Sequence, residues 1–523
     1  MAVQTIDRTI IKKVKRLREG ESPRFMDLFS GCGGISLGFL TAGYSPVAAV
    51  EIDSWAASSH GTNFAGFSAG SSPEGHHKAR DITQEDPESI FHDLGIKGKV
   101  EDQIDVLVGG PPCQAFARVG RAKLRHEARR LQLDDAEKAF LFDGRVNLWE
   151  RYLHYVRQTK PVALLMENVP DILNHGGTNL AETVAEHLRD EGYRVSYTLL
   201  NAAMYGVPQI RERMFLLGIH ESLSKDPVFP TPTHHVTLPS GYEGTRATAR
   251  KHIFLNGSQS HLWIDDAHAD AGHPKATSAW DALADLPPIY AQEEMESGRL
   301  RRGRKDPMEP CLYKTKKPSS AWSRLMRCWP GFETGSKTTG HIIRYLPRDY
   351  KIFKIMGEGW QYPDVWRYVE EKRRALEIER HKNGLSTDKR TVEGKAFHRD
   401  WTLPYDPDKF PNKWWKLDRE RPVRTLMAHL GKDSYSHIHF DSEQARPISV
   451  REAARLQSFP DGFVFDGSMN PALRQIGNAV PPLLAYAVAM AMRKTLGCKS
   501  IDDIRIQLLG LEPALIKATA GRK

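Results

Sequence analysis

The sequence predicts an α/β protein with a doubly wound, mostly parallel sheet and a second, irregular domain. Short apolar runs alternate with helical stretches up to about residue 225, a pattern typical of parallel sheets. A glycine-rich turn separates the first apolar run from the first helical stretch. Polar residues follow several of the apolar runs, and ligands bind at that end of the strands in such sheets.

The first predicted unit consists of a strand, a glycine turn and a helix. Residues 24–29 form an apolar run, 30–34 read Ser-Gly-Cys-Gly-Gly, and apolar residues recur at helical spacing over 35–40. A second strand over 47–50 leads to Glu51, about 20 positions beyond the turn, where a carboxylate can accept ribose hydroxyls. The glycines do not follow the GxGxxG spacing and no P-loop lysine is present, so neither a dinucleotide nor a nucleoside triphosphate is the first expectation.

The remaining strands of the sheet are expected in chain order. One ends near Asp81 and Ile82, and another over 104–108 leads into the sequence Gly-Gly-Pro-Pro-Cys-Gln at 109–114. Further strands are predicted at 162–166, 193–197 and 214–219, with helices at 148–156 and 179–190. The side chains expected at strand ends are Phe29, Glu51, Asp81, Cys113 and Glu167.

Cys113 is the candidate nucleophile. It stands on a loop just after a strand, where glycines allow a ligand to approach the backbone and prolines stiffen the exit. A buried, unreactive thiol is the commoner role for a lone cysteine. The residues around it in the chain favour the nucleophile.

The composition is that of a basic protein with no sign of secretion. The 523 residues carry a formal charge of +9 and a pI near 9.1, which point weakly to a polyanionic partner, and 299–305 is a basic cluster. No run is long and apolar enough to span a bilayer, and the N-terminus has no apolar signal core. The five cysteines form no CxxC pair, so we expect no metal site, no disulfide framework and a cytoplasmic, reducing location.

Six motifs occur in order along the chain, and with them it resembles the DNA (cytosine-5) methyltransferase family, of prokaryotic or phage type. They are Asp27-Leu28-Phe29-Ser30-Gly31-Cys32-Gly33-Gly34, Gly110-Pro111-Pro112-Cys113-Gln114, Glu167-Asn168-Val169, Gln209-Ile210-Arg211-Glu212-Arg213, the segment from Arg451 to Pro460, and Gly477-Asn478-Ala479-Val480-Pro481. The resemblance covers about 23–220 and 421–490. It implies the class I S-adenosylmethionine-dependent methyltransferase fold, and methyl transfer to carbon 5 of a flipped-out cytosine in double-stranded DNA.

The resemblance also implies the catalytic residues. Cys113 matches the cysteine whose thiolate adds to carbon 6 of cytosine, a covalent step that needs an activated thiol. Glu167 matches the glutamate that bonds ring N3 and the amino group. Arg213 matches the arginine that reaches the cytosine carbonyl oxygen, and Arg211 is expected to support the glutamate and the loop. Without the motifs, Glu167 would read as a capped strand end and the arginines as a solvated pair.

For the cofactor, S-adenosyl-L-methionine, the resemblance places adenine against Phe29 and the ribose hydroxyls on Glu51, with Asp81 on the adenine amino group. Asn478 and Val480 are expected to close the methionine end, and Asp53 to be a neighbouring surface carboxylate. The full set of expected cofactor residues is Asp27, Phe29, Gly31, Gly33, Gly34, Glu51, Ile52, Asp81, Ile82, Pro111, Asn478 and Val480.

The domain boundaries are set by where the strand–helix pattern ends and by which residues the resemblance covers. A basic lead-in (1–22) precedes a catalytic domain in two parts (23–224 and 446–497), which enclose a target-recognition domain (225–445), and a tail (498–523) ends the chain. The middle domain is rich in Arg, Lys, His, Trp and Gly, and such loops can read DNA. Helical periodicity returns at 449–457 and 483–496.

DNA contacts are expected from the loop after Cys113 and from the basic cluster. Where the family has Phe-Ser, this chain has Phe116 and Ala117, so a hydroxyl that could contact a phosphate is lost and its role could pass to neighbouring arginines. The predicted DNA-binding residues are Gln114, Arg118, Arg121, Arg301, Arg302 and Arg304.

Two other functions compete with a DNA methyltransferase. A tRNA cytosine-5 methyltransferase has the same chemistry, although such enzymes lack a large variable region; a catalytically silent DNA-binding relative would not need intact motifs. We expect a monomer, with a cognate restriction or defence system as the candidate partner and no membrane.

Overall fold

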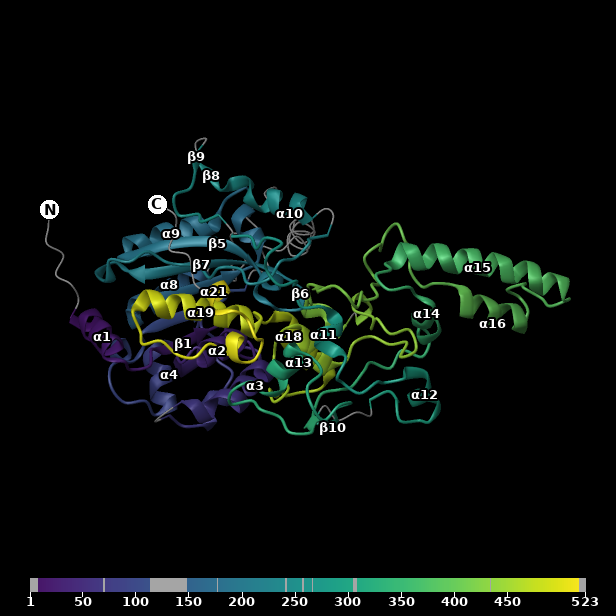
Figure 1. Ribbon diagram of the computed structural model, residues 1–523, viewed down its shortest axis with the longest axis horizontal. Helices are drawn as coiled ribbons and strands as arrows, with labels where there is room; N and C mark the ends of the chain where they lie inside the picture. The colour runs from purple at the N-terminus through teal and green to yellow at the C-terminus, as the bar shows by residue number, and fades with distance from the viewer. Residues whose placement is uncertain are drawn as a thin grey trace.

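A computed structural model describes residues 8–68, 71–112, 148–175, 177–239, 242–255, 258–265, 267–303, 308–432 and 434–516. The molecule is elongated, with a large sheet and its helices at one end (Figure 1). At the other end lies a largely helical region, from which a pair of helices projects away from the rest of the molecule.

The central sheet has six strands in the order β2-β1-β3-β4-β7-β5. They are β1 (Arg24–Leu28), β2 (Ser45–Val50), β3 (Val106–Gly109), β4 (Ala163–Asn168), β5 (Tyr193–Asn201) and β7 (Glu212–His220). Strand β7 is antiparallel to both of its neighbours, whereas β2, β1, β3 and β4 pair in parallel. The mostly parallel sheet expected from the sequence is therefore confirmed, and the reversal of β7 brings its first residues beside the last residues of β4.

One expected strand is absent from the described residues. The segment that ends at Asp81 and Ile82 continues as a turn, with a single backbone bond from Arg80 N–H to the carbonyl of Glu51 (2.7 Å). The prediction of a strand here was wrong because this one bond is not followed by a ladder. The bond still places Asp81 beside the carboxyl end of β2.

Helices cover both faces of the sheet, as the alternation of apolar residues along the strands requires. One face packs on α2 (Gly34–Thr41) and α19 (Pro482–Leu496), and the other on α4 (Pro87–Leu94), α8 (Leu148–Thr159) and α9 (Leu180–Asp190). In β1, Phe25 belongs to the first apolar cluster, and Met26 and Leu28 belong to the second.

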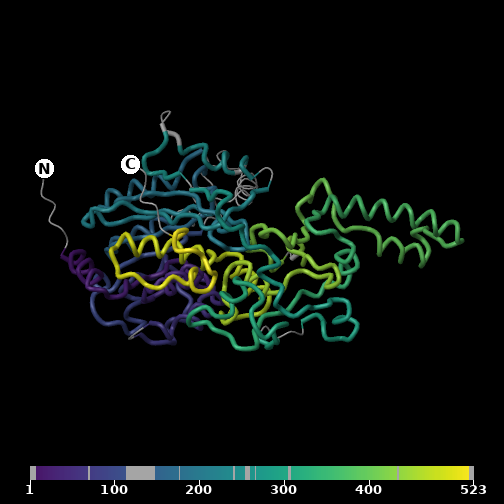
Figure 2. The backbone as a smooth tube through the Cα atoms, in the orientation of Figure 1, coloured from purple at the N-terminus to yellow at the C-terminus, as the bar shows by residue number. Residues whose placement is uncertain are grey.

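The catalytic body is built from both ends of the chain. A Cβ on Gly38 of α2 would lie 2.5 Å from the backbone nitrogen of Tyr486 in α19, so the two helices touch at a glycine. Figure 2 shows the long helix α19, in yellow, beside the purple N-terminal part of the chain.

The region distant from the sheet has its own apolar cluster, which includes Phe353, Tyr362 and Trp414. The helices that pack in or against this cluster are α12 (Ala291–Glu296), α14 (Tyr350–Ile355), α15 (Tyr362–Lys382) and α16 (Val392–Trp401). Helices α11 (Ala279–Leu283) and α13 (Ala321–Arg327) instead pack in the first apolar cluster, with α2 and α19. Helices α15 and α16 form the projecting pair (Figure 1).

The chain does not leave the catalytic body at residue 225. Tyr197 in β5 donates its backbone N–H to Leu262 (2.9 Å), and the buried side chains of Ile253, Leu262 and Trp263 join the core on one face of the sheet. Helix α10 (Tyr242–Ala249) lies in the same segment. The segment looked separate in the sequence because it lacks strand–helix alternation, yet it forms an outer layer on β5 and α9.

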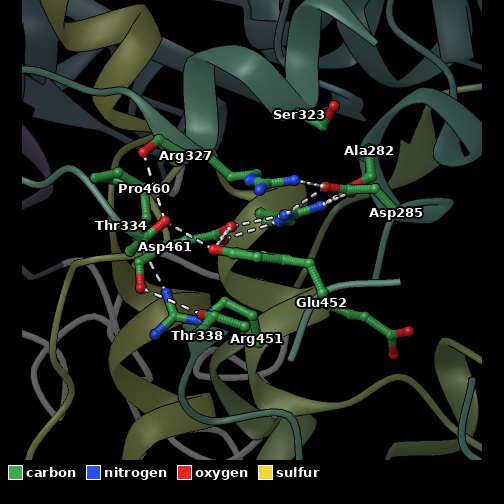
Figure 3. Close-up of polar contacts among 12 residues, drawn as sticks. Ala282, Asp285, Ser323, Arg327, Thr334, Thr338, Arg451, Glu452, Pro460 and Asp461 are labelled. Carbon is green, nitrogen blue, oxygen red and sulfur yellow. Dashed lines mark hydrogen bonds and ion pairs between the residues drawn. The ribbon is translucent and has the colours of Figure 1, made fainter. Parts of the chain in front are cut away.

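Helix α17 (Val450–Leu456) joins the two regions through buried charges. Arg455 donates to Asp461 (Nε to Oδ1, 2.8 Å) and to Asp285, while Arg451 donates to the carbonyls of Thr339 and Pro460 (2.8 and 3.0 Å). Figure 3 shows Asp285, Arg327, Arg451 and Asp461, which come from segments far apart in the sequence, lying close together.

The two ends of the chain pack on the body. Lys13 in α1 (Arg8–Glu19) donates to the carbonyls of Ile104, Thr159 and Lys160 (2.5, 2.9 and 2.8 Å), which caps the end of α8. The tail forms α20 (Ile504–Gln507) and α21 (Pro513–Ile516). Among the described helices, none has the length and apolar character needed to cross a membrane.

Candidate active site

Glu167 and Arg213 form an ion pair at the carboxyl edge of the sheet. Glu167 lies near the end of β4 and Arg213 near the start of β7, and the antiparallel pairing of these strands brings Arg213 Nε to 3.0 Å from Glu167 Oε1. Both side chains are about one-eighth exposed, at 13%. Burial raises the pKa of Glu167, and the charges of Arg213 and Arg211 oppose that rise.

The loop that leads to Cys113 begins directly beside this pair. Asn168 Nδ2 donates to the carbonyl of Pro111 (3.1 Å), and Gly110 N–H donates to the carbonyl of Leu28 (3.3 Å). A Cβ on Gly110 would lie 2.9 Å from Glu167 Oε2, so glycine allows the backbone to approach the carboxylate. Cys113, Gln114, Arg118 and Arg121 lie outside the described residues.

Arg211 joins separate segments of the catalytic body. It is buried between β6 (Gln209–Ile210) and β7, and it donates to the carbonyls of Leu426 (2.9 Å) and Gly477 (3.1 Å). The sequence suggested that Arg211 supports the glutamate. In the structure Arg213 makes the ion pair with Glu167, and Arg211 holds the segments around 426 and 477 next to it.

The carboxyl ends of β1 and β2 form the second part of the site. Glu51 Oε2 accepts the N–H of Gly31 (2.9 Å), and Glu51 Oε1 accepts the N–H of Asp53 (2.8 Å). Burial raises the pKa of Glu51. Phe29 has a φ of 58°, a left-handed conformation that costs a side-chain-bearing residue roughly 1–2 kcal/mol. Such strain is characteristic of functional sites.

The three glycines of the turn have different surroundings. Gly31 has no atom within 4 Å of the position a Cβ would take, so the space there is open. A Cβ on Gly33 would meet the ring of Phe64 at 2.2 Å, and one on Gly34 would meet the carbonyl oxygen of Val480 at 2.3 Å. Gly31 is therefore the one of the three positioned to face a ligand, while Gly33 and Gly34 permit close packing beneath the turn.

The other expected cofactor residues divide into surface and buried groups. Ile52 is 67% exposed, and Asp81 is partly exposed and accepts the N–H and hydroxyl of Thr83. Asn478 is exposed next to Val480. Buried side chains, which lie behind the surface of the site, belong to Asp27, Ile82, Pro111 and Val480.

The structure adds a contact that the sequence did not suggest. Arg474 of α18 (Met469–Asn478) pairs with Asp53 at 2.7 Å, and Asp53 also caps α3 (Ser54–Phe64) by accepting from Trp55 and Ala56. No local pattern signals this pair, because 421 residues separate its members.

The predicted DNA-binding arginines of the basic cluster are not close to this edge. Arg301 and Arg302 are exposed and follow α12, which lies far from the sheet along the molecule (Figure 1). Arg304 lies outside the described residues. Within the described part of the chain, no group of three or more His, Cys, Asp or Glu side chains could hold a metal ion.

Comparisons with known proteins agree on one family. The model of the C-5 cytosine-specific DNA methylase family matches residues 23–299 and 309–494. A putative type II methyltransferase of Oceanobacillus iheyensis, M.OihORF3336P, is 36% identical over 91% of this chain and 97% of its own length. The type II methyltransferase M.AgeI of Thalassovita gelatinovora is 31% identical over 90% of this chain and 98% of its own length.

A solved structure supports the fold. It is a putative DNA modification methyltransferase encoded within an E. coli prophage, with a TM-score of 0.54 and 21% identity. The similarity covers 91% of this chain and 99% of that one.

Proposed function

The chain belongs to the C-5 cytosine-specific DNA methylase family and methylates DNA site-specifically at carbon 5 of cytosine, and we propose that Cys113, Glu167 and Arg213 carry out the reaction. The observation that best supports these roles is the ion pair between Glu167 and Arg213 beside the loop that leads to Cys113. It places an acid and a cation at the edge of the sheet where ligands bind.

Cys113 is proposed as the nucleophile that activates the base. Carbon 5 of cytosine is itself a poor nucleophile and needs such activation before it can take up a methyl group. When the thiolate forms a bond to carbon 6, the electrons of the 5,6 double bond move to carbon 5, which can then accept a methyl group. Loss of the proton from carbon 5 and departure of the thiolate restore the double bond. The step needs a thiolate, so it slows as the thiol becomes protonated.

Glu167 and Arg213 would hold the cytosine ring during this addition. A protonated Glu167 donates to ring N3 and stabilises the electrons pushed into the ring, and its burial favours the protonated form. Arg213 supplies charge near the carbonyl oxygen and keeps the carboxyl oriented. The flipped-out base that this requires must leave the duplex stack.

The residues around the glycine turn fit S-adenosyl-L-methionine as the cofactor, which supplies the methyl group. Open space lies above Gly31, the strained Phe29 adjoins it, and the Glu51 carboxylate is fixed by two backbone N–H groups. A carboxylate fixed in this way can accept ribose hydroxyls. We assign the cofactor to this part of the edge.

Target recognition is proposed for the region that packs around Trp414 and for the basic cluster beyond α12. The type II names of the relatives support a role in modifying one short site, with a partner endonuclease as the candidate cognate protein. A DNA substrate implies a cytoplasmic location.

The experiment that tests the function is methyl transfer from labelled S-adenosylmethionine to duplex DNA and to tRNA. Label is expected in cytosine of duplex DNA alone. Label in tRNA and none in DNA would establish the alternative substrate, and absence of label in both would support a silent DNA-binding protein.

A further inference from the structure

Three buried side chains form a hydrogen-bonded chain directly beneath the glycine turn. The Ser36 hydroxyl of α2 lies 2.6 Å from Asp27 Oδ2 of β1 and 2.9 Å from His60 Nε2 of α3. Asp27, Ser36 and His60 are 1%, 0% and 3% exposed. A Cβ on Gly33 would lie 3.1 Å from the His60 ring, so this chain of side chains supports the turn from below.

The proton positions in this chain follow from its chemistry. A hydroxyl has one proton, and Ser36 donates it to Asp27 Oδ2. His60 must therefore donate from Nε2 to the Ser36 oxygen, which leaves His60 Nδ1 without a proton. Burial lowers the pKa of His60 to about 3, so the ring is neutral.

The second carboxylate oxygen of Asp27 accepts no hydrogen bond from the described residues. This atom, Oδ1, is buried. Leaving such an atom unpaired in the interior is costly, so in native proteins water, an ion or a ligand commonly satisfies it. When Asp27 is ionised, Ser36 holds one of its oxygens, and the other remains able to interact with a positive charge outside the protein.

The groups that face Asp27 do not neutralise it. Ser36 of α2 donates to Asp27, and His60 of α3 lies behind Ser36. Glu51 beyond β2, Cys32 of the turn and Tyr152 of α8 interact with Asp27 by charge. His76 and His77 lie beyond His60 and act on its ring. Burial raises the pKa of Asp27 to about 7, and the charge of Glu51 adds to the rise.

The cofactor and its product differ in one charge. S-adenosylmethionine carries a sulfonium cation, and loss of the methyl group leaves the neutral thioether of S-adenosylhomocysteine. We propose that ionised Asp27, held by Ser36 and His60 as positioning residues, makes the site prefer the sulfonium form over the thioether. This inference rests on the proposed cofactor. The attraction acts through the turn by charge and needs no direct contact, because opposite charges interact across low-dielectric protein.

The sign of the pH effect follows from this assignment. A bound cation favours the ionised form, so S-adenosylmethionine lowers the pKa of Asp27, and its binding releases protons near pH 7. Binding of S-adenosylhomocysteine releases fewer. The preference for the sulfonium form is largest above the pKa of Asp27 and declines as the pH falls through about 7.

The test is isothermal titration calorimetry of the full chain with both ligands, at pH 6 to 8.5, in buffers of different ionisation enthalpy. Wild-type protein is expected to prefer S-adenosylmethionine by about tenfold more at pH 8.5 than at pH 6, and to release more protons with it at pH 7. In Asp27→Asn the preference should not change with pH, and the excess proton release should disappear. The titrating amino group is common to both ligands, so the comparison with Asp27→Asn isolates the contribution of Asp27.

A second measurement tests whether Ser36 and His60 position Asp27. Ser36→Ala and His60→Leu remove support for ionised Asp27, so the pH at which the preference is half lost should rise, whereas His60→Gln keeps a donor and should restore it. Ser68→Ala is the matched control, because the Ser68 hydroxyl is also buried but donates to the carbonyl of Pro46 (3.1 Å).

The outcomes separate the inference from the function on which it rests. If neither ligand binds the wild-type protein, the proposed cofactor is wrong. If both ligands bind but release equal numbers of protons, or if Asp27→Asn and Ser36→Ala keep the wild-type pH dependence, then Asp27 does not discriminate between them.

Discussion

At the scale of single residues, two largely buried carboxylates differ in the groups that they contact. Glu167 lies against an arginine, and desolvation favours its protonated form. Glu51 accepts two backbone N–H bonds that favour its charged form, against the same desolvation. One group is thus suited to donate a proton to a base, and the other to accept hydroxyls.

Replacing Glu167 with glutamine should lower kcat by about 10²–10⁴-fold, the range for loss of a general acid, and leave DNA binding nearly unchanged. In the wild type, activity that depends on protonated Glu167 should decline as the pH rises through its raised pKa. The variant should lose that decline. A pH–rate profile at saturating DNA measures both effects, and a variant with unchanged kcat and the same alkaline decline would remove Glu167 from the reaction.

Replacing Glu51 with alanine should weaken S-adenosylmethionine binding far more than DNA binding. Loss of a charged acceptor costs roughly 1.5–3 kcal/mol, which is about a 10- to 150-fold rise in Kd. Calorimetry with the exposed Glu88→Ala as control gives the measurement. An unaltered cofactor affinity would exclude Glu51 from the site.

At the scale of elements, α17 determines how the two regions are joined. Its charged side chains are buried, and together they bind the segments around residues 285, 339, 446 and 460. An ion pair in the interior is a poor source of net stability, but removing one partner leaves an uncompensated buried charge.

Arg455→Ala should therefore destabilise the protein by about 3–5 kcal/mol, because it removes the arginine that pairs with both buried aspartates. Among the described residues, Asp285 then keeps only its longer pair with Arg327 (3.6 Å), and Asp461 keeps the hydroxyl of Tyr313 (2.7 Å). Arg474→Ala, which removes the half-exposed partner of Asp53, should cost under about 1 kcal/mol. Urea denaturation of both variants gives the comparison. Equal losses would show that α17 does not depend on its buried charges.

How far the sequence predicted these elements depends on the range of the interactions. The strands around Phe25, Val108 and Leu165 were predictable because local apolar runs determine them. The contacts of Arg211 with Leu426 and Gly477 were not, since segments more than 200 residues apart supply the acceptors. The strand expected to end near Asp81 and Ile82 did not form. A short sequence pattern cannot reveal whether a neighbouring strand will pair with it.

At the scale of the whole molecule, the boundary between the two regions differs from the one that the sequence pattern suggested. The absence of strand–helix alternation after residue 225 suggested one inserted domain, yet Leu262 and Trp263 pack on the sheet. Between Ile343 and Trp414 the clustered apolar residues belong to the separate cluster alone, whereas Trp322 and Leu426 belong to the core of the catalytic body. Residues 343–414, which include the projecting helices, are therefore the unit that can vary without disturbing the catalytic edge.

Grafting residues 343–414 from a relative of different specificity should move the methylated site and preserve the rate of methyl transfer, because none of the described residues of the catalytic core lies in this range. Methylome sequencing of a host that expresses the graft identifies the site. A graft of 225–445 is the control, and it should lose stability because it also replaces Ile253, Leu262 and Trp263 in the core. An active 343–414 graft that methylates the original site would place recognition elsewhere.

The central claim is that Cys113 forms a covalent bond with the target cytosine. Duplex DNA with 5-fluorocytosine at the target tests it directly, because fluorine at carbon 5 cannot leave as a proton does and the adduct persists. With S-adenosylmethionine, the wild-type protein should give a denaturant-resistant complex on a gel, and Cys113→Ala should give none. An active wild-type enzyme that forms no such complex, or a complex that survives the loss of Cys113, would contradict the account.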